Sequence, residues 1–198
     1  MKKVWFTLML VICVLMGSVG AYAGETYRLM VFGDSLSAGY RLKKNESFAS
    51  QLQDALLEKG YTQVEIINES RSGETTGGGL RRQSAALKKK PNAVLLELGI
   101  NDVLRGESIA RITQNLSELI ENFQDDDIAV LLAGMKAPPI TEPAYARQFE
   151  QMYQSLARKY RVKLYPFFMQ AIFQNAGGSY EKAMPYLKAD KAHPTSEG

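Results

Sequence analysis

The chain is organised around one stretch of ten residues, Val31-Phe32-Gly33-Asp34-Ser35-Leu36-Ser37-Ala38-Gly39-Tyr40. The apolar run Leu29 to Phe32 is typical of a short buried strand, and it breaks at Gly33 into a segment that can open a helix. A serine at such a corner lies at the carboxyl edge of a sheet, close to backbone N–H groups that favour negative charge. Ser35 is therefore a candidate nucleophile, although Asp34 or Ser35 could also be a plain helix cap.

The composition is that of a globular protein with a single domain. The chain has 198 residues, of which 45% are hydrophobic and 23% charged, and its formal net charge is +3. Such a chain is long enough to bury a core, and its composition excludes disordered and fibrous classes. The nearly balanced charge gives no reason to expect nucleic acid as a partner.

The first 23 residues have the three parts of a secretory signal. Lys2-Lys3 precedes an apolar run at 4–16, and Ala21-Tyr22-Ala23 places small residues where a signal peptidase cuts. We expect cleavage after Ala23, a mature domain over 24–198 and a periplasmic or secreted bacterial protein without stable membrane insertion. An uncleaved membrane anchor is the alternative. The single cysteine, Cys13, lies in this leader, so no disulfide is expected in the mature chain.

Strand-like and helix-like segments alternate from Tyr27 onward, which predicts an α/β fold with a parallel sheet and helices on both faces. The five expected strands cover residues 27–32, 64–67, 93–98, 128–133 and 162–165. Apolar residues at helical spacing predict helices over 48–56, 80–87, 109–123 and 145–156. These connections favour a single flavodoxin-like, three-layer domain with the strand order 2-1-3-4-5.

The only histidine lies in the segment Asp190-Lys191-Ala192-His193. On one helical turn or tight loop, a spacing of three lets the Asp190 carboxylate reach Nδ1 of the ring. Nε2 then remains free to accept a proton from a hydroxyl group, as a serine nucleophile requires. A lone histidine is usually structural or exposed. Because the sequence has no second one, any imidazole-based mechanism must use His193.

Two further strand ends offer hydrogen-bond donors for a negatively charged intermediate. Gly73 follows the second expected strand and has no side chain to block its backbone N–H. Asn101 follows the third and carries a neutral amide donor. With the N–H of Ser35, three donors would converge where an acyl-transfer reaction develops an oxyanion. Taken singly, Gly73 and Asn101 are also ordinary turn residues.

Four short blocks together resemble the GDSL or SGNH hydrolase family. They occur in the family's order, and they are Gly33-Asp34-Ser35-Leu36, Gly73, Gly99-Ile100-Asn101-Asp102 and Asp190-Lys191-Ala192-His193. The resemblance implies a catalytic triad of Ser35, Asp190 and His193. It also implies an oxyanion hole formed by Ser35, Gly73 and Asn101, on the family's flavodoxin-like fold.

Longer runs at 33–40, 72–79 and 98–106 look most like the group of periplasmic acyl-CoA thioesterases I within this family. Members of that group also carry lysophospholipase and arylesterase activity. Together with the leader, the resemblance predicts an exported serine esterase that acts on small acyl esters, thioesters or lysophospholipids through an acyl-enzyme. We also expect a monomer. A carbohydrate O-acetyl esterase is the closest alternative, and a non-catalytic binding module on the same fold is a second one.

Two departures from the family pattern concern the site and the chain end. Ile100 stands where close relatives often have glycine, and its side chain would narrow the mouth of the site. The sequence ends at Gly198, five residues after His193, where relatives continue into a closing helix, so a truncated C-terminus is expected. Apolar residues of the loops at the sheet edge are candidates for an acyl pocket, with plain loop packing as the alternative: Ile100, Leu104, Met135 and Ile140.

Neither metal nor nucleotide chemistry is predicted. One histidine and no cysteine in the mature chain leave only carboxylates as strong metal ligands, so we expect no metal site and no cofactor. The glycine run at 77–79 lacks the Lys-Ser/Thr pair of a phosphate-binding loop. Asp125-Asp126-Asp127 and Lys88-Lys89-Lys90 are read as solvated ends of helices.

Overall fold

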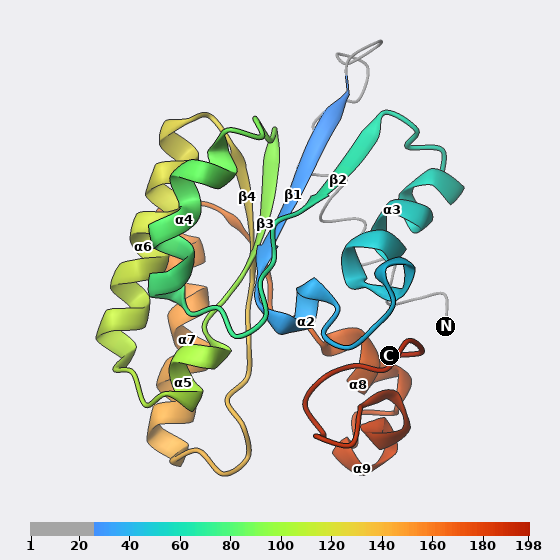
Figure 1. The fold of residues 1–198 in the computed structure, drawn as a ribbon. Helices are drawn as coiled ribbons and strands as arrows, with labels where there is room; N and C mark the ends of the chain where they lie inside the picture. The colour runs from blue at the N-terminus through green and yellow to red at the C-terminus, as the bar shows by residue number, and fades with distance from the viewer. Residues whose placement is uncertain (1–25) are drawn as a thin grey trace.

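A computed structural model describes residues 26–198 of the chain (Figure 1). The predicted leader over 1–23 lies outside the described residues. Within 26–198, none of the helices combines the length and the apolar character that a membrane crossing requires.

A five-stranded parallel sheet forms the centre of the molecule, and its strand order is β2-β1-β3-β4-β5. The strands are β1 (Tyr27–Gly33), β2 (Val64–Asn68), β3 (Ala93–Glu97), β4 (Ala129–Ala133) and β5 (Lys163–Tyr165). Both the predicted fold class and the predicted strand order are confirmed. The observed strands differ from the expected ones by one residue at some ends, which is within the usual uncertainty of strand boundaries.

Helices cover both faces of the sheet and make a three-layer structure (Figure 1). Helix α3 (Phe48–Glu58) lies on one face, and α4 (Thr76–Leu87), α6 (Ile109–Asp125) and α7 (Pro143–Tyr160) lie on the other. Side chains of β1 alternate between the two layers: Leu29 and Val31 join the core beneath α3, whereas Met30 and Phe32 join the larger core beneath α6. The apolar runs of the central strands are explained by this burial on both faces.

Helix α4 begins four residues earlier than the pattern predicted, because it includes the glycines at 77–79. Thr75 caps it through Oγ1, which accepts a hydrogen bond from Gly78 N at 3.1 Å. A Cβ atom on Gly79 would lie only 2.7 Å from Leu98 Cδ1, so glycine is needed where α4 packs closely against the end of β3. Close packing therefore outweighs the poor helix propensity of glycine here.

Four short helices complete the chain, and only the first of them, which follows Gly33, was anticipated from the sequence. They are α2 (Ser35–Ala38), α5 (Ile100–Leu104), α8 (Gln170–Asn175) and α9 (Tyr180–Ala183). Helix α2 follows β1 directly and α5 follows β3, so both start at the carboxyl edge of the sheet. Because Gly33 of β1 pairs with Glu97 of β3, the two helix starts are side by side. The fold thus brings Ser35 of α2 and Asn101 of α5 to the same edge of the sheet.

Candidate active site

The side chains of Ser35, His193 and Asp190 form a continuous chain of contacts. Nε2 of His193 lies 2.8 Å from Ser35 Oγ, and Nδ1 lies 2.9 Å from Asp190 Oδ2. The ring also packs against Tyr40, with 4.7 Å between the ring centroids. Ser35 is half-buried and His193 keeps 22% of its side chain exposed, so a small molecule can reach the serine hydroxyl. This geometry is suited to proton transfer from a serine nucleophile.

A tight loop near the chain end presents Asp190 and His193 on the same side. Leu187 and Pro194 pair as an isolated antiparallel bridge, and Lys188 N donates to His193 O at 2.8 Å. Lys191 turns the loop with a φ of 59°, a left-handed backbone conformation that residues other than glycine rarely adopt. A loop, rather than a helical turn, therefore brings the two side chains, which are three residues apart, into contact.

The carboxylate of Asp190 is held in its charged form. Partial burial by itself would raise the pKa of Asp190, but hydrogen bonds to the carboxylate outweigh this effect and lower the pKa to about 2. Oδ1 accepts from the backbone N–H groups of Ala192 and His193, each at 3.0 Å, and Oδ2 faces the imidazole ring. A fixed negative charge beside Nδ1 orients the imidazole ring.

Ser35 is the first residue of α2, immediately after the cap. Asp34 Oδ1 accepts a hydrogen bond from Leu36 N at 2.9 Å, so Asp34 is the helix cap that the sequence allowed. Gly39 ends the helix with a φ of 80°. Together, Gly33 to Ser37 form a sharp corner, called here the Ser35 turn, which leads from the sheet to the helix.

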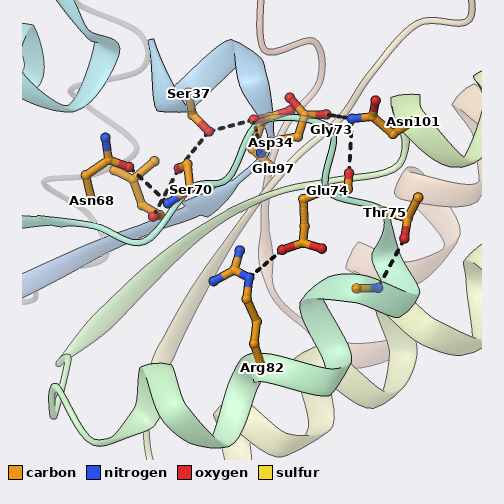
Figure 2. Close-up of polar contacts among 12 residues, drawn as sticks. Asp34, Ser37, Asn68, Ser70, Gly73, Glu74, Thr75, Arg82, Glu97 and Asn101 are labelled. Carbon is orange, nitrogen blue, oxygen red and sulfur yellow. Dashed lines mark hydrogen bonds and ion pairs between the residues drawn. The ribbon is translucent and has the colours of Figure 1, made fainter. Parts of the chain in front are cut away.

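Asn101, the predicted amide donor, lies beside the Ser35 turn (Figure 2). Its Nδ2 donates to Asp34 Oδ2 at 2.9 Å and to the backbone carbonyl of Glu74 at 3.0 Å. Gly73, one residue before Glu74, is exposed and has a φ of 77°. The structure therefore brings Asn101 and the Gly73 loop to Asp34, the neighbour of Ser35, while both amide hydrogens of Asn101 have protein partners.

Two buried carboxyl groups lie under the Ser35 turn. Asp34 and Glu97 are both fully buried, and Glu97 Oε2 accepts hydrogen bonds from Asp34 N at 3.2 Å and from Ser37 Oγ at 2.7 Å. Burial raises the pKa of Asp34 to about 7. Burial, and next the nearby Asp34 carboxyl, raise the pKa of Glu97 well above its ordinary value. Sequence reasoning missed Glu97, whose only signal is an acid at the end of an apolar strand.

A third buried carboxyl group, that of Asp102, connects the helices around the site. Asp102 of α5 accepts hydrogen bonds from Thr76 N at 2.8 Å and from Thr76 Oγ1 at 2.6 Å, and Asn115 of α6 donates to the same threonine oxygen. Burial raises the pKa of Asp102 in spite of these bonds. Asp102 thus fixes the start of α5, and with it Asn101, against the start of α4.

The loop after β2 also carries a buried ion pair (Figure 2). Arg82 Nε of α4 donates to Glu74 Oε2 at 2.6 Å, and the guanidinium lies 3.9 Å from the centre of the Phe32 ring. The Glu74 side chain is therefore held by α4 while its backbone carbonyl accepts from Asn101. Both interactions limit the freedom of the segment that follows Gly73.

The four residues predicted for an acyl pocket do not form one wall. Met135 is only 3% exposed and belongs to the core, whereas Leu104 at the end of α5 is 64% exposed and Ile140 in the loop after β4 is 95% exposed. Ile100 is half-buried and packs against the core. Met135 is in the core because it lies two residues after the buried end of β4, and the two exposed residues lie on segments that leave the sheet.

A cavity of about 360 Å³ lies between α3, α8 and the last residues of the chain. It is lined mostly by apolar side chains, among them Leu36, Phe48, Phe168, Met169, Ile172 and Tyr186. None of the four predicted pocket residues lines it, but Leu36 and Pro194, the chain neighbours of Ser35 and His193, do. Within residues 26–198, no cluster of three or more His, Cys, Asp and Glu side chains is arranged to hold a metal ion.

Comparison with known proteins gives one family. Residues 31–198 match the model of the GDSL-like lipase/acylhydrolase family. The chain is 40% identical over 185 residues to an arylesterase of Vibrio mimicus, and the matched region covers 93% of this chain and 88% of that protein. It is 35% identical over 154 residues to thioesterase 1/protease 1/lysophospholipase L1 of Escherichia coli strain K12, covering 77% and 71%. The crystal structure of AlinE4, an SGNH-hydrolase family esterase, matches with a TM-score of 0.76 and 42% identity, covering 88% and 89%.

Proposed function

Because the chain belongs to the GDSL-like lipase/acylhydrolase family, we propose that it is an exported serine esterase that hydrolyses carboxylic esters and thioesters. The observation that carries this proposal is the contact chain from Ser35 Oγ through the imidazole of His193 to Asp190. Ser35 lies 158 residues before His193 in the chain, and the three residue types are those that acyl transfer uses.

In the proposed mechanism, Ser35 Oγ attacks the carbonyl carbon of the ester or thioester. His193 Nε2 takes the hydroxyl proton and then gives it to the leaving alcohol or thiol, which departs and leaves an acyl-enzyme on Ser35. Water attacks the acyl-enzyme with His193 as the base, and the carboxylic acid is released. Asp190 keeps the proton of the neutral ring on Nδ1 and stabilises the imidazolium that forms in both steps.

We assign the oxyanion hole to the N–H groups of Ser35 and Gly73 and to the side-chain amide of Asn101. Fixed donors of this kind contribute roughly 3 kcal/mol each to transition-state stabilisation. The bond from Asn101 to Glu74 O is the one that must be shared with the oxyanion, because the bond to Asp34 fixes the orientation of the amide. A domain over 24–198, a leader over 1–23 and a monomeric state belong to the same proposal.

The proposal is tested on the full-length protein with p-nitrophenyl esters of rising acyl length, an acyl-CoA and a lysophospholipid, together with a fluorophosphonate probe that labels activated serines. We expect hydrolysis of several chain lengths and one label per molecule. Ser35→Ala should abolish labelling and lower kcat by about 10⁴-fold or more. Ser155→Ala, on the exposed surface of α7, is the matched control and should keep full activity.

Three outcomes would contradict the proposal. Absence of labelling in the wild-type protein would favour a binding module. An unchanged rate of hydrolysis by Ser35→Ala would mean that a group other than Ser35 is the nucleophile. Cleavage of acetyl esters alone would replace the proposed substrate range with carbohydrate O-acetyl esters. N-terminal sequencing of the exported protein tests cleavage after Ala23.

A further inference from the structure

Glu97 is an acid at the end of a buried strand, in a place where apolar residues would normally be found. It is the last residue of β3, it is fully buried, and Oε1 has no hydrogen-bond partner among residues 26–198. The nearest acidic neighbour, Asp34, adds a repulsive charge. Burial of an incompletely paired carboxyl group disfavours folding, because the group loses its hydration without a full set of hydrogen bonds. A residue with this cost calls for a role other than stabilising the core.

The contacts of Glu97 are concentrated on the Ser35 turn (Figure 2). Oε2 accepts from Asp34 N, one residue before the serine, and from Ser37 Oγ, two residues after it. One oxygen atom therefore holds the turn on both sides of Ser35. Ser37 is itself fully buried and also lies 2.9 Å from Ser70 Oγ in the loop after β2.

The close approach depends on glycine in the strand. A Cβ atom on Gly33 would come within 2.5 Å of Glu97 Oε2 and would overlap Ser37 Oγ. The pairing of Gly33 with Glu97 in the sheet fixes the backbone part of this approach. The Glu97 side chain thus fills a space that exists because residue 33 is glycine.

We propose that Glu97 is a positioning residue for hydrolysis, which holds the Ser35 turn so that Ser35 presents its hydroxyl to His193 and its N–H to the oxyanion. This inference rests on the proposed function. Burial favours the neutral acid, and both donors contact Oε2 rather than Oε1. Glutamine has the same shape and can accept the same two hydrogen bonds through its amide oxygen.

The inference is tested with Glu97→Ala, Glu97→Gln and Ser37→Ala in the full-length protein. We expect Glu97→Ala to lower both kcat and the rate of fluorophosphonate labelling by about 10- to 100-fold, with KM changed less than about 3-fold, because a shifted nucleophile slows chemistry more than binding. Glu97→Gln should restore both rates to within about 3-fold of wild type. Ser37→Ala should slow both rates in the wild-type background and have no further effect in Glu97→Ala.

The control separates positioning from stability. Gln83→Ala removes a buried side chain of α4 that donates to Leu119 O at 2.7 Å, away from the Ser35 turn. It should lower the melting temperature and leave kcat unchanged. If Glu97→Ala is folded by circular dichroism and is labelled at the wild-type rate, the inference is wrong. If Glu97→Ala does not fold, wild-type kcat in Ser37→Ala overturns the inference instead. A wild-type protein without labelling would contradict the proposed function itself, which is a separate result.

Discussion

At the residue scale, Asp190 is the side chain whose chemistry is most tightly set by its contacts. Two backbone N–H groups hold Oδ1, so Oδ2 is left to face the imidazole of His193. Because the two carboxylate oxygens have different partners, a change of one atom can alter the contact with the imidazole alone. Replacing Oδ2 by an amide nitrogen keeps the loop bonds and alters only the partner of the ring.

We expect Asp190→Asn to fold and to lose about 10³- to 10⁴-fold in kcat, because an amide N–H facing Nδ1 forces the ring proton onto Nε2, where a base is needed. The measurement is kcat for a short p-nitrophenyl ester, with circular dichroism as a check of the fold. Asp125→Asn, at the exposed end of α6, is the control and should have wild-type activity. A kcat for Asp190→Asn within about 3-fold of wild type would remove Asp190 from the proposed mechanism.

At the element scale, α4 shows how packing selects residues that a helix otherwise disfavours. Gly77 and Gly79 lie in the same first turns, but only Gly79 touches the core. A Cβ on Gly79 would meet Leu98 at 2.7 Å and Phe32 at 3.1 Å, whereas the nearest atom to a Cβ on Gly77 would be 3.4 Å away on Asn115. Packing therefore requires glycine at position 79 but not at position 77.

This difference predicts opposite effects of the same substitution. Gly79→Ala should lower the free energy of unfolding by about 1–3 kcal/mol, because the added methyl group overpacks the core. Gly77→Ala should raise it by about 0.5–1 kcal/mol through improved helix propensity. Urea unfolding of both variants measures the two values. An unchanged free energy of unfolding in Gly79→Ala would mean that α4 can move away from β3 without loss of stability.

At the scale of the whole molecule, the carboxyl groups buried beneath the site link stability to pH. Burial raises the pKa values of Asp34, Glu97 and Asp102 above those of an unfolded chain. The folded protein therefore retains protons that the unfolded chain has released, and the free energy of unfolding falls as the pH rises through this range. Asp190 acts oppositely: its lowered pKa contributes stability above pH 3.8, which is lost as the pH falls toward 2.

We expect the free energy of unfolding to fall between pH 5 and pH 8. For Asp34, with a pKa raised from 3.8 to about 7, the expected change is roughly 2–3 kcal/mol over this interval. Urea unfolding at both pH values measures it. Glu97→Gln removes one titrating group and should reduce the slope. Equal slopes in wild type and Glu97→Gln would show that Glu97 does not titrate on folding in this range.

Local patterns in the sequence were sufficient to predict the fold and to select the candidate site residues. Alternating apolar strands and helical spacing predicted the three layers and the order β2-β1-β3-β4-β5, because burial on one or both faces imposes a period that is visible in the chain. The spacing of Asp190 and His193 predicted that the carboxylate would reach the ring. These features depend on neighbours a few residues apart, or on rules of connection that hold for all parallel sheets.

Only the tertiary structure decided which distant side chains meet. Glu97 is one acid in an apolar strand until the pairing with Gly33 brings it under the Ser35 turn, 60 residues from Ser37 in the chain. In the same way, the core takes Met135 while Ile140 stays at the surface. Such contacts are fixed by sheet register and by the space that packing leaves, and neither quantity is expressed in the order of nearby residues.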